Sequence, residues 1–215
     1  MIRTTKYLEN LTLDYCLAHS SALGDILYEL ERETHLKTLS PQMISGPLQG
    51  QFFSFISKML RPKTILEIGT FTAYASICLA QGLAEGGILH TIEVNEELEY
   101  LIREYIEKAG LSDKIKVHIG DAKKIVPTLS EKFDLIFIDA GKNDNEFYYE
   151  LAMEQLKSGG YILVDNVLWS GKVIQAKQDK DTQKIDAFNK KVQEDARVEN
   201  LLLPFRDGIF LIRKR

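Results

Sequence analysis

The sequence predicts an α/β fold, a doubly wound and mainly parallel sheet of seven strands with an antiparallel pair at its C-terminal end. Two observations support this fold class. Short apolar runs alternate with helical patterns from residue 63 to residue 165, which is typical of a parallel sheet flanked by helices. Two further apolar runs, 198–203 and 208–213, are joined by the short turn Pro204-Phe205-Arg206-Asp207 and predict the antiparallel pair.

Length and composition favour a single globular domain over residues 1–215. Hydrophobic residues make up 45% of the chain and charged residues 27%, and the net charge of −4 disfavours a general nucleic-acid binder. Cys16 and Cys78 lie in apolar, helical segments and are expected to be free thiols. No signal core follows the N-terminus, and no apolar run approaches the roughly 20 residues of a membrane helix. We therefore expect a cytoplasmic protein without a membrane anchor.

The chain opens with a helical region, residues 4–36, in which Leu23, Ile26, Leu27 and Leu30 recur at helical spacing. It is expected to pack on the edge of the domain or at a subunit interface. A loop over 40–51, with two prolines and two glycines, runs into a helix predicted at 48–60.

The remaining elements follow the alternation of strand and helix. Strands are predicted at 63–69, 88–93, 114–119, 133–138 and 161–164. Helices are predicted at 74–84, 96–109, 123–129, 145–156 and 181–195. Asn95 is a suitable N-cap for the second of these helices, and Gly110 a suitable residue to end it.

Acidic residues stand at the ends of four strands, at Glu67, Glu93, Asp121 and Asp139. Ligands of doubly wound sheets bind beyond the carboxyl ends of the strands, at the topological switch point. One polar residue after a strand is ordinary, because turns are polar, but four in series predict a lined pocket.

Two of the strands also suggest a cation site. The strand at 133–138 ends on Asp139, the strand at 161–164 ends on Asp165-Asn166, and Lys142 follows Asp139 by three residues. Carboxylate and amide oxygens are ligands that hard divalent cations prefer. An amine beside such a cation can serve as a base.

The first two strand ends point to an adenosine site. Gly69 follows the first strand and lets a ligand approach the backbone. Glu93 lies 24 residues later (93 − 69 = 24), close to the roughly 20 residues expected for an acid that binds a ribose. Asp121 and Ala122 could accept a hydrogen bond from an exocyclic amine and pack beside a purine.

The turn after the first strand separates two adenosine-containing ligands. A dinucleotide site requires G-x-G-x-x-G, whereas residues 69–74 read Gly-Thr-Phe-Thr-Ala-Tyr. Glu67 would repel a pyrophosphate and attract an ammonium group, which favours S-adenosylmethionine. An NAD-binding oxidoreductase and a non-catalytic nucleotide-binding protein remain the alternatives from another class.

The motifs together resemble a known family, the cation-dependent O-methyltransferases, which include catechol and caffeoyl-CoA O-methyltransferases and bacterial relatives. The resemblance runs from about Leu39 to the C-terminus and implies the Rossmann-like fold of class I S-adenosylmethionine-dependent methyltransferases. Its motifs are Gln42-Met43, Pro47-Leu48-Gln49-Gly50, residues 66–72, Glu93, Gly120-Asp121-Ala122, Phe137-Ile138-Asp139-Ala140, Lys142, residues 165–171 and Asp207-Gly208.

The resemblance implies a role for each matching residue. The S-adenosylmethionine site would contain Met43, Ile44, Glu67, Gly69, Thr70, Tyr74, Ser76, Glu93, Asp121, Ala122 and Asp139. The metal, Mg²⁺ before Mn²⁺ or Ca²⁺, would be bound by Asp139, Asp165 and Asn166. Lys142 would be the general base, acting beside Asp139, and Trp169 with Lys142 would flank the acceptor.

The chain departs from the family pattern in three places. Ala73 replaces a usual glycine, and Ala75 replaces a serine that contacts the cofactor carboxylate, so Ser76 or a backbone amide is expected to make that contact. Asp144-Asn145 replaces Asn-Tyr after Lys142, on the side of the acceptor.

The resemblance implies O-methylation of a vicinal-diol aromatic, a catechol-like small molecule, by a homodimer. Methylation of a hydroxylated uridine in tRNA is the alternative with the same chemistry. The acidic net charge counts against tRNA, and the lysines of the segment after Trp169 count for it: Lys172, Lys177, Lys180 and Lys184.

Overall fold

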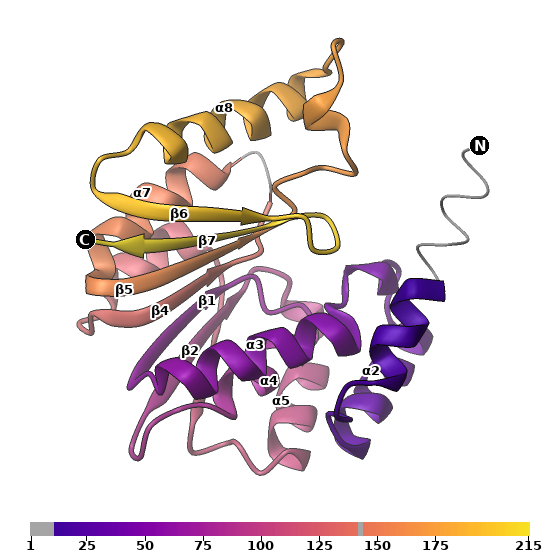
Figure 1. Ribbon diagram of the computed structural model, residues 1–215. Coiled ribbons are helices and arrows are strands. Elements are labelled where there is room, and N and C mark those ends of the chain that lie inside the picture. Colours follow the sequence, from indigo (N-terminus) through magenta and orange to yellow (C-terminus); the bar gives the residue numbers. More distant parts are fainter. Residues whose placement is uncertain (1–10, 142–143) are drawn as a thin grey trace.

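The computed structural model describes residues 11–141 and 144–215, and within them seven strands form one sheet (Figure 1). The strand order is β3-β2-β1-β4-β5-β7-β6. Neighbouring strands from β3 to β5 pair in parallel, and β7 pairs antiparallel with both β5 and β6. The predicted fold class is confirmed. The strands are β1 Thr64–Ile68, β2 Ile88–Glu93, β3 Ile115–Ile119, β4 Phe133–Ile138, β5 Leu156–Asp165, β6 Val198–Leu203 and β7 Ile209–Lys214.

Helices cover both faces of this sheet. Figure 1 shows α3, α4 and α5 on one side of it and α7 and α8 on the other. The α-helices are α2 Asp25–Lys37, α3 Gly46–Leu60, α4 Tyr74–Ala80, α5 Glu99–Lys108, α6 Ala122–Ile125, α7 Asn145–Gln155 and α8 Lys180–Glu194. Short 3₁₀ turns lie at Pro41–Met43, Glu96–Leu98, Val126–Thr128 and Lys172–Ile174. The predicted cap is confirmed, because the Asn95 side chain accepts a hydrogen bond from the Glu97 amide.

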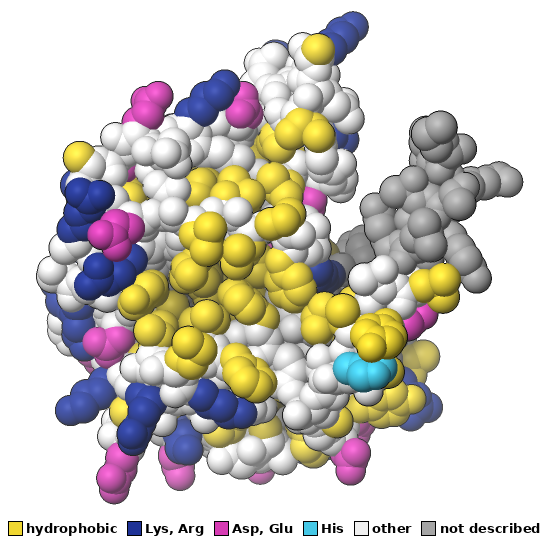
Figure 2. All heavy atoms as spheres, viewed as in Figure 1, with side chains coloured by type: hydrophobic (Ala, Val, Ile, Leu, Met, Phe, Trp, Pro, Cys, Tyr) yellow, Lys and Arg dark blue, Asp and Glu magenta, His cyan; other side chains and the backbone are white. Residues whose placement is uncertain are grey.

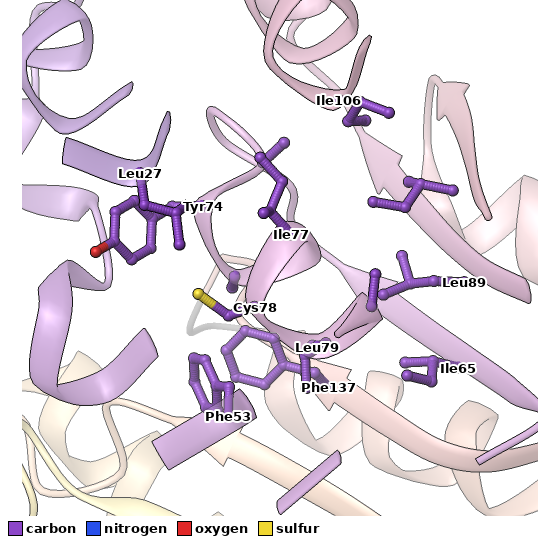
Figure 3. Packing of buried hydrophobic residues seen from close by; sticks show 14 of the residues in the cluster. Leu27, Phe53, Ile65, Tyr74, Ile77, Cys78, Leu79, Leu89, Ile106 and Phe137 are labelled. Carbon is purple, nitrogen blue, oxygen red and sulfur yellow. The ribbon is translucent and has the colours of Figure 1, made fainter. Parts of the chain in front are cut away.

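The central strands are buried on both faces, which explains their continuous apolar runs. In β4, Leu135 and Phe137 pack among the helices α2 to α5, whereas Ile136 and Ile138 pack on the side of α7 and α8. Figure 3 shows Phe137 beside Phe53 of α3, with a ring-centroid distance of 4.6 Å. Every residue of α4 is buried. The helix that follows the first strand is therefore fixed from all sides.

The N-terminal helical region is not continuous, as the prediction for 4–36 had it. A helix over residues 11–18 is separated from α2 by residues 19–24, while residues 4–10 lie outside the described part. Gly24, with φ 95°, precedes α2 and turns the chain. A positive φ is accessible to glycine at little cost, so Gly24 can turn the chain at the start of α2.

Several other boundaries also differ from the predicted ones, and three of them have a structural cause. α3 begins at Gly46 because Pro47 is favourable in the first turn of a helix. α4 ends at Ala80 rather than 84, since Gly82 lies against α3, where a Cβ would come within 2.1 Å of the Ser57 backbone. β5 begins at Leu156 rather than 161, because its register with β4 shifts between Phe133 and Leu135 and accommodates the intervening residues.

Both cysteines are free, as predicted, with Cys78 buried and Cys16 half-buried. Among the described residues, no helix combines the length and apolarity needed to cross a membrane.

Candidate active site

One large cavity, of about 1050 Å³, lies at the carboxyl ends of β1, β2, β4 and β5. Its position is that expected for the switch point of a doubly wound sheet, between β1 and β4. Most of the predicted site residues meet on its wall: Met43, Ile44, Gly69, Thr70, Tyr74, Glu93, Asp121, Ala122, Asp139, Asp165, Asn166 and Trp169. Three of the four predicted acidic strand ends, Glu93, Asp121 and Asp139, therefore share one pocket.

Glu93 is held at the end of β2 by two backbone amides. Its Oε2 accepts a hydrogen bond from Phe71 N at 2.8 Å, and its Oε1 accepts one from Asn95 N at 2.9 Å. Each carboxylate oxygen can accept a second hydrogen bond. Glu93 is thus oriented in advance and still able to accept from two vicinal hydroxyls, which fits a ribose.

Gly69 is required by a close contact between two strand ends. Its φ is 98°, and a Cβ at this position would lie 2.3 Å from the carbonyl oxygen of Asp139. Gly69 N donates to Ile92 O at 3.0 Å, and Asp139 N donates to Ile68 O at 2.9 Å. The glycine therefore lets the ends of β1, β2 and β4 lie side by side. This packing role is additional to the predicted one, in which the glycine lets a ligand approach the backbone.

Asp121 and Ala122 form the third side of the cavity. Asp121 caps α6, because its Oδ1 accepts a hydrogen bond from Lys123 N at 2.9 Å. Ala122 is buried beside it. The cap fixes the carboxylate at the cavity wall, where its other oxygen suits an exocyclic amine.

Glu67 and Ser76 do not line the cavity, in contrast to the other predicted cofactor residues. Both are fully buried, and the Ser76 hydroxyl donates a short hydrogen bond to Glu67 Oε2. Burial raises the pKa of Glu67 to about 8, so the carboxyl group is mainly protonated at neutral pH. Glu67 thus does not present a charge to a cofactor ammonium, and the Ser76 hydroxyl is already engaged.

The departures at Ala73 and Ala75 have a structural meaning. Ala73 has φ 69°, in the left-handed region where glycine is usual, and it precedes α4 as its N-cap. Ala75 lines the cavity at the position where the family has serine. Since Ser76 points elsewhere, a backbone amide is the remaining expected donor for the cofactor carboxylate.

Asp165 and Asn166 end β5 in a constrained turn. Asp165 Oδ1 accepts from Asn166 N at 2.7 Å, and Asn166 has φ 60°. The Asn166 Nδ2 donates to Asp207 Oδ2 at 3.4 Å. Because the amide nitrogen faces Asp207, the carbonyl oxygen of Asn166, the end that can bind a cation, is not used in that contact.

The donor set fits a hard cation. Two carboxylates and one amide, from Asp139, Asp165 and Asn166, line the same cavity. In the part of the chain that the structure describes, no group of three or more His, Cys, Asp or Glu side chains is arranged so that it could hold a metal ion by itself. Oxygen-only ligands with room for water suit Mg²⁺, whereas structural zinc sites require nitrogen or sulfur ligands.

The structure describes some of the residues predicted on the acceptor side of the cavity. Lys142 lies outside the described residues, and its neighbours Gly141 and Asp144 line the cavity. Trp169 lies at the cavity wall, and Lys172 Nζ is 5.9 Å from its ring centroid. The Asp144 side chain pairs with Lys123 at 3.0 Å. The departure at Asp144 therefore introduces a carboxylate into the cavity wall.

The sequence did not point to the side chains that lie behind the predicted cation ligands. Gln49 Nε2 donates to Asp165 Oδ2 at 2.8 Å, and Arg206 Nη1 donates to Gln49 Oε1 at 2.6 Å. Asp207 accepts from Asn166 and from the backbone of Ser170. Gln49 and Asp207 stand in motifs of the resemblance, but no spacing in the sequence places them beside Asp165.

Comparison with known proteins agrees with this site. The family model described as O-methyltransferase matches residues 17–215. A probable caffeoyl-CoA O-methyltransferase of Dictyostelium discoideum is 34% identical over 212 residues, covering 95% of this chain and 92% of that protein.

Two solved structures have the same fold. A methyltransferase of Podospora anserina, bound to S-adenosylhomocysteine, has a TM-score of 0.89 with 29% identity and covers 97% of this chain and 96% of its own. An O-methyltransferase of Bacillus cereus, in complex with S-adenosylhomocysteine, has a TM-score of 0.87 with 31% identity, covering 95% and 97%. These relatives decide against the NAD-binding oxidoreductase and the non-catalytic alternative. The chain belongs to the O-methyltransferase family of the caffeoyl-CoA type and is an S-adenosylmethionine-dependent O-methyltransferase.

Proposed function

We propose that this enzyme methylates a hydroxyl group of a vicinal-diol aromatic, a catechol-like small molecule, with the help of a divalent cation, Mg²⁺ first. One observation supports this most directly. The oxygen ligands Asp139, Asp165 and Asn166 line the same cavity as the ribose-type acid Glu93 and the adenine-type acid Asp121. A cation that holds two adjacent hydroxyls would thus place them beside the methyl donor.

Each described residue has a defined task in this proposal. Glu93 accepts hydrogen bonds from the ribose, Asp121 accepts from the adenine amine, and Trp169 packs against the acceptor ring. When bound, S-adenosylmethionine supplies the methyl group and Mg²⁺ lowers the pKa of an acceptor hydroxyl. By resemblance, Lys142 removes the proton of that hydroxyl, and much of the rate gain comes from holding the two substrates in register.

Methyl transfer from labelled S-adenosylmethionine to a panel of catechols tests the cation. We expect EDTA to abolish transfer and added Mg²⁺ to restore it. Asp165→Asn should lower activity while retaining S-adenosylhomocysteine binding, because Asp165 lies on the cation side of the cavity. Full activity in EDTA would exclude a role for the metal.

Lys142→Ala tests the base. General acid–base groups typically contribute about 10²- to 10⁴-fold to the rate, so kcat should fall by that order while both ligands still bind. Lys124→Ala, at a lysine of α6 outside the cavity lining, is the matched control. Normal turnover of Lys142→Ala would exclude Lys142 as the base.

Methylation of tRNA remains a prediction for the acceptor. Lys172 lies beside Trp169, but it also lies 3.7 Å from Asp179, which partly balances its charge. Undermethylated tRNA in a deletion strain, combined with no activity on any catechol, would favour tRNA over the small molecule.

Homodimer formation and a cytoplasmic location also remain predictions. Figure 2 shows apolar side chains gathered over α3 and the β6–β7 hairpin, where Phe55, Met59 and Leu201 are exposed. This surface is a second candidate interface beside the N-terminal helices. Light scattering of the purified protein measures the oligomeric state directly.

A further inference from the structure

The turn between β6 and β7, residues 204–208, contacts two parts of the cavity lining, the segment 41–45 and the residues that follow β5. Arg206 has φ 51°, a backbone conformation that residues other than glycine rarely adopt. Its Nη1 donates to Ile44 O at 3.1 Å, to Ser45 O over a shorter distance and to Gln49 Oε1 at 2.6 Å. The guanidinium thus contacts the segment 41–45, whose members Met43 and Ile44 line the cavity.

Gln49 extends this contact to a predicted cation ligand. Gln49 has no exposed surface, and its Nε2 donates to Asp165 Oδ2 at 2.8 Å. The direction of the amide is fixed by chemistry, because a guanidinium can only donate and an ionised carboxylate can only accept. Arg206 therefore orients Gln49, and Gln49 orients Asp165.

Asp207, the next residue of the turn, contacts Asn166, the predicted cation ligand that follows β5. Asp207 accepts from Asn166 Nδ2 at 3.4 Å and from Ser170 N, and its carbonyl accepts from Leu168 N at 2.8 Å. Two adjacent residues of one turn thus support Asp165, through Gln49, and Asn166, directly.

We propose that Arg206 and Gln49 are a pair of positioning residues that join the cofactor segment 41–45 to the cation ligand Asp165. Cofactor binding and cation binding are then coupled through this pair. The inference rests on the proposed function, in which Asp165 binds a cation. Residues that orient metal ligands typically contribute about 10- to 100-fold to metal affinity, so the pair should have an effect of that size.

The experiment measures two affinities of the cofactor-free protein, Mn²⁺ by electron paramagnetic resonance and S-adenosylhomocysteine by calorimetry. Gln49→Leu should weaken Mn²⁺ binding by about 10- to 100-fold. Arg206→Gly should weaken both ligands, although glycine suits the backbone of the turn, and Arg206→Lys should recover part of the loss. Melting temperature is recorded for each variant, since a merely structural role would appear there.

Gln51→Leu and Arg213→Gln are the matched controls. Gln51 lies on the same helix but donates to Ser21 O, and Arg213 lies on the same hairpin but pairs with Glu199. Neither lines the cavity, so both variants should keep both affinities.

Unchanged affinities in Gln49→Leu and Arg206→Gly, within about twofold, would overturn the inference. If Gln49→Leu does not fold, the two Arg206 variants decide. If the unsubstituted protein binds S-adenosylhomocysteine but no Mn²⁺, the cation proposal fails by itself. The positioning of segment 41–45 is then judged from S-adenosylhomocysteine affinity in Arg206→Gly, where a loss supports it and retention refutes it.

Discussion

Glu67 and Thr91 are register partners on β1 and β2, and the Thr91 hydroxyl donates a 2.6 Å hydrogen bond to the Glu67 carboxyl group. Burial raises the pKa of Glu67 from 4.5 to about 8. A raised pKa means that the folded protein binds this proton more tightly than the unfolded chain. The resulting stability is complete below pH 4.5 and is lost progressively as the pH rises from there through the folded pKa of about 8.

Glu67→Gln should therefore flatten the pH dependence of stability between about pH 5 and pH 8, because glutamine resembles the protonated acid. Urea denaturation of the cofactor-free protein across this range measures it. Glu85→Gln, at an exposed glutamate, removes the same charge and should keep the original slope. An unchanged slope in Glu67→Gln would show that Glu67 does not titrate there.

A histidine pair should destabilise the protein in acid. His90 Nδ1 lies 3.0 Å from His118 Nε2, His90 is buried, and Glu131 lies 3.8 Å from His90 Nε2. Burial lowers the pKa of both histidines below 6.5. The unfolded chain then binds more protons, so stability should fall as the pH drops below about 6.5.

Substitution of the buried member of the pair tests this. His90→Gln should reduce the loss of stability between pH 6.5 and pH 5, measured as the difference in denaturation midpoint. His35→Gln, at an exposed histidine of α2, should leave that loss unchanged. Equal slopes for the two variants would contradict the prediction.

Arg61 is a site where glycine should stabilise the fold. It follows α3 in the left-handed conformation, with φ 47°, and its amide donates to Ser57 O at 2.7 Å. Glycine adopts this conformation without the penalty of a Cβ, so Arg61→Gly should gain roughly 1 kcal/mol in the free energy of unfolding. Arg103→Gly, inside α5, should instead lose about 1 kcal/mol. A loss of stability in both variants would show that contacts of the Arg61 side chain stabilise the fold more than the left-handed backbone conformation costs.

Gly69→Ala should be strongly destabilising. The new Cβ would meet the carbonyl oxygen of Asp139 at 2.3 Å, and φ is already 98°. Strain and clash together should cost about 2–4 kcal/mol and weaken cofactor binding. Gly110→Ala, with φ 67° and no atom within 4 Å of the added Cβ, isolates the strain alone. Similar losses at both glycines would show that the clash is relieved by movement.

The sheet, and the acidic residues that gather at its carboxyl edge, could be predicted from the sequence because both follow from local patterns. Apolar runs define the strands, and the residue after each run falls at one edge of a parallel sheet. The start of β5 was predicted five residues late, since Gly159-Gly160 is typical of a loop and here belongs to an irregular part of the strand.

The side chains that lie behind the predicted cation ligands had no local pattern. Gln49 contacts Asp165 from 116 residues away, and Arg206 contacts Gln49 from 157 residues away. The full burial of Glu67 was also not predicted. In a strand that is buried on both faces, the sequence pattern does not show whether a residue lines a pocket or lies in the core.

The position of the last hairpin has a consequence for the synthesis of the protein. Because β7 runs antiparallel to β5 and β6, the turn between β6 and β7 lies at the edge of the sheet where the parallel strands end and the cavity is formed. A nascent chain that ends before residue 206 contains every predicted ligand yet lacks the group that joins segment 41–45 to Gln49. Such a chain would also lack β7, the strand that lies between β5 and β6, so the last two strands and this contact of the cavity complete the fold together.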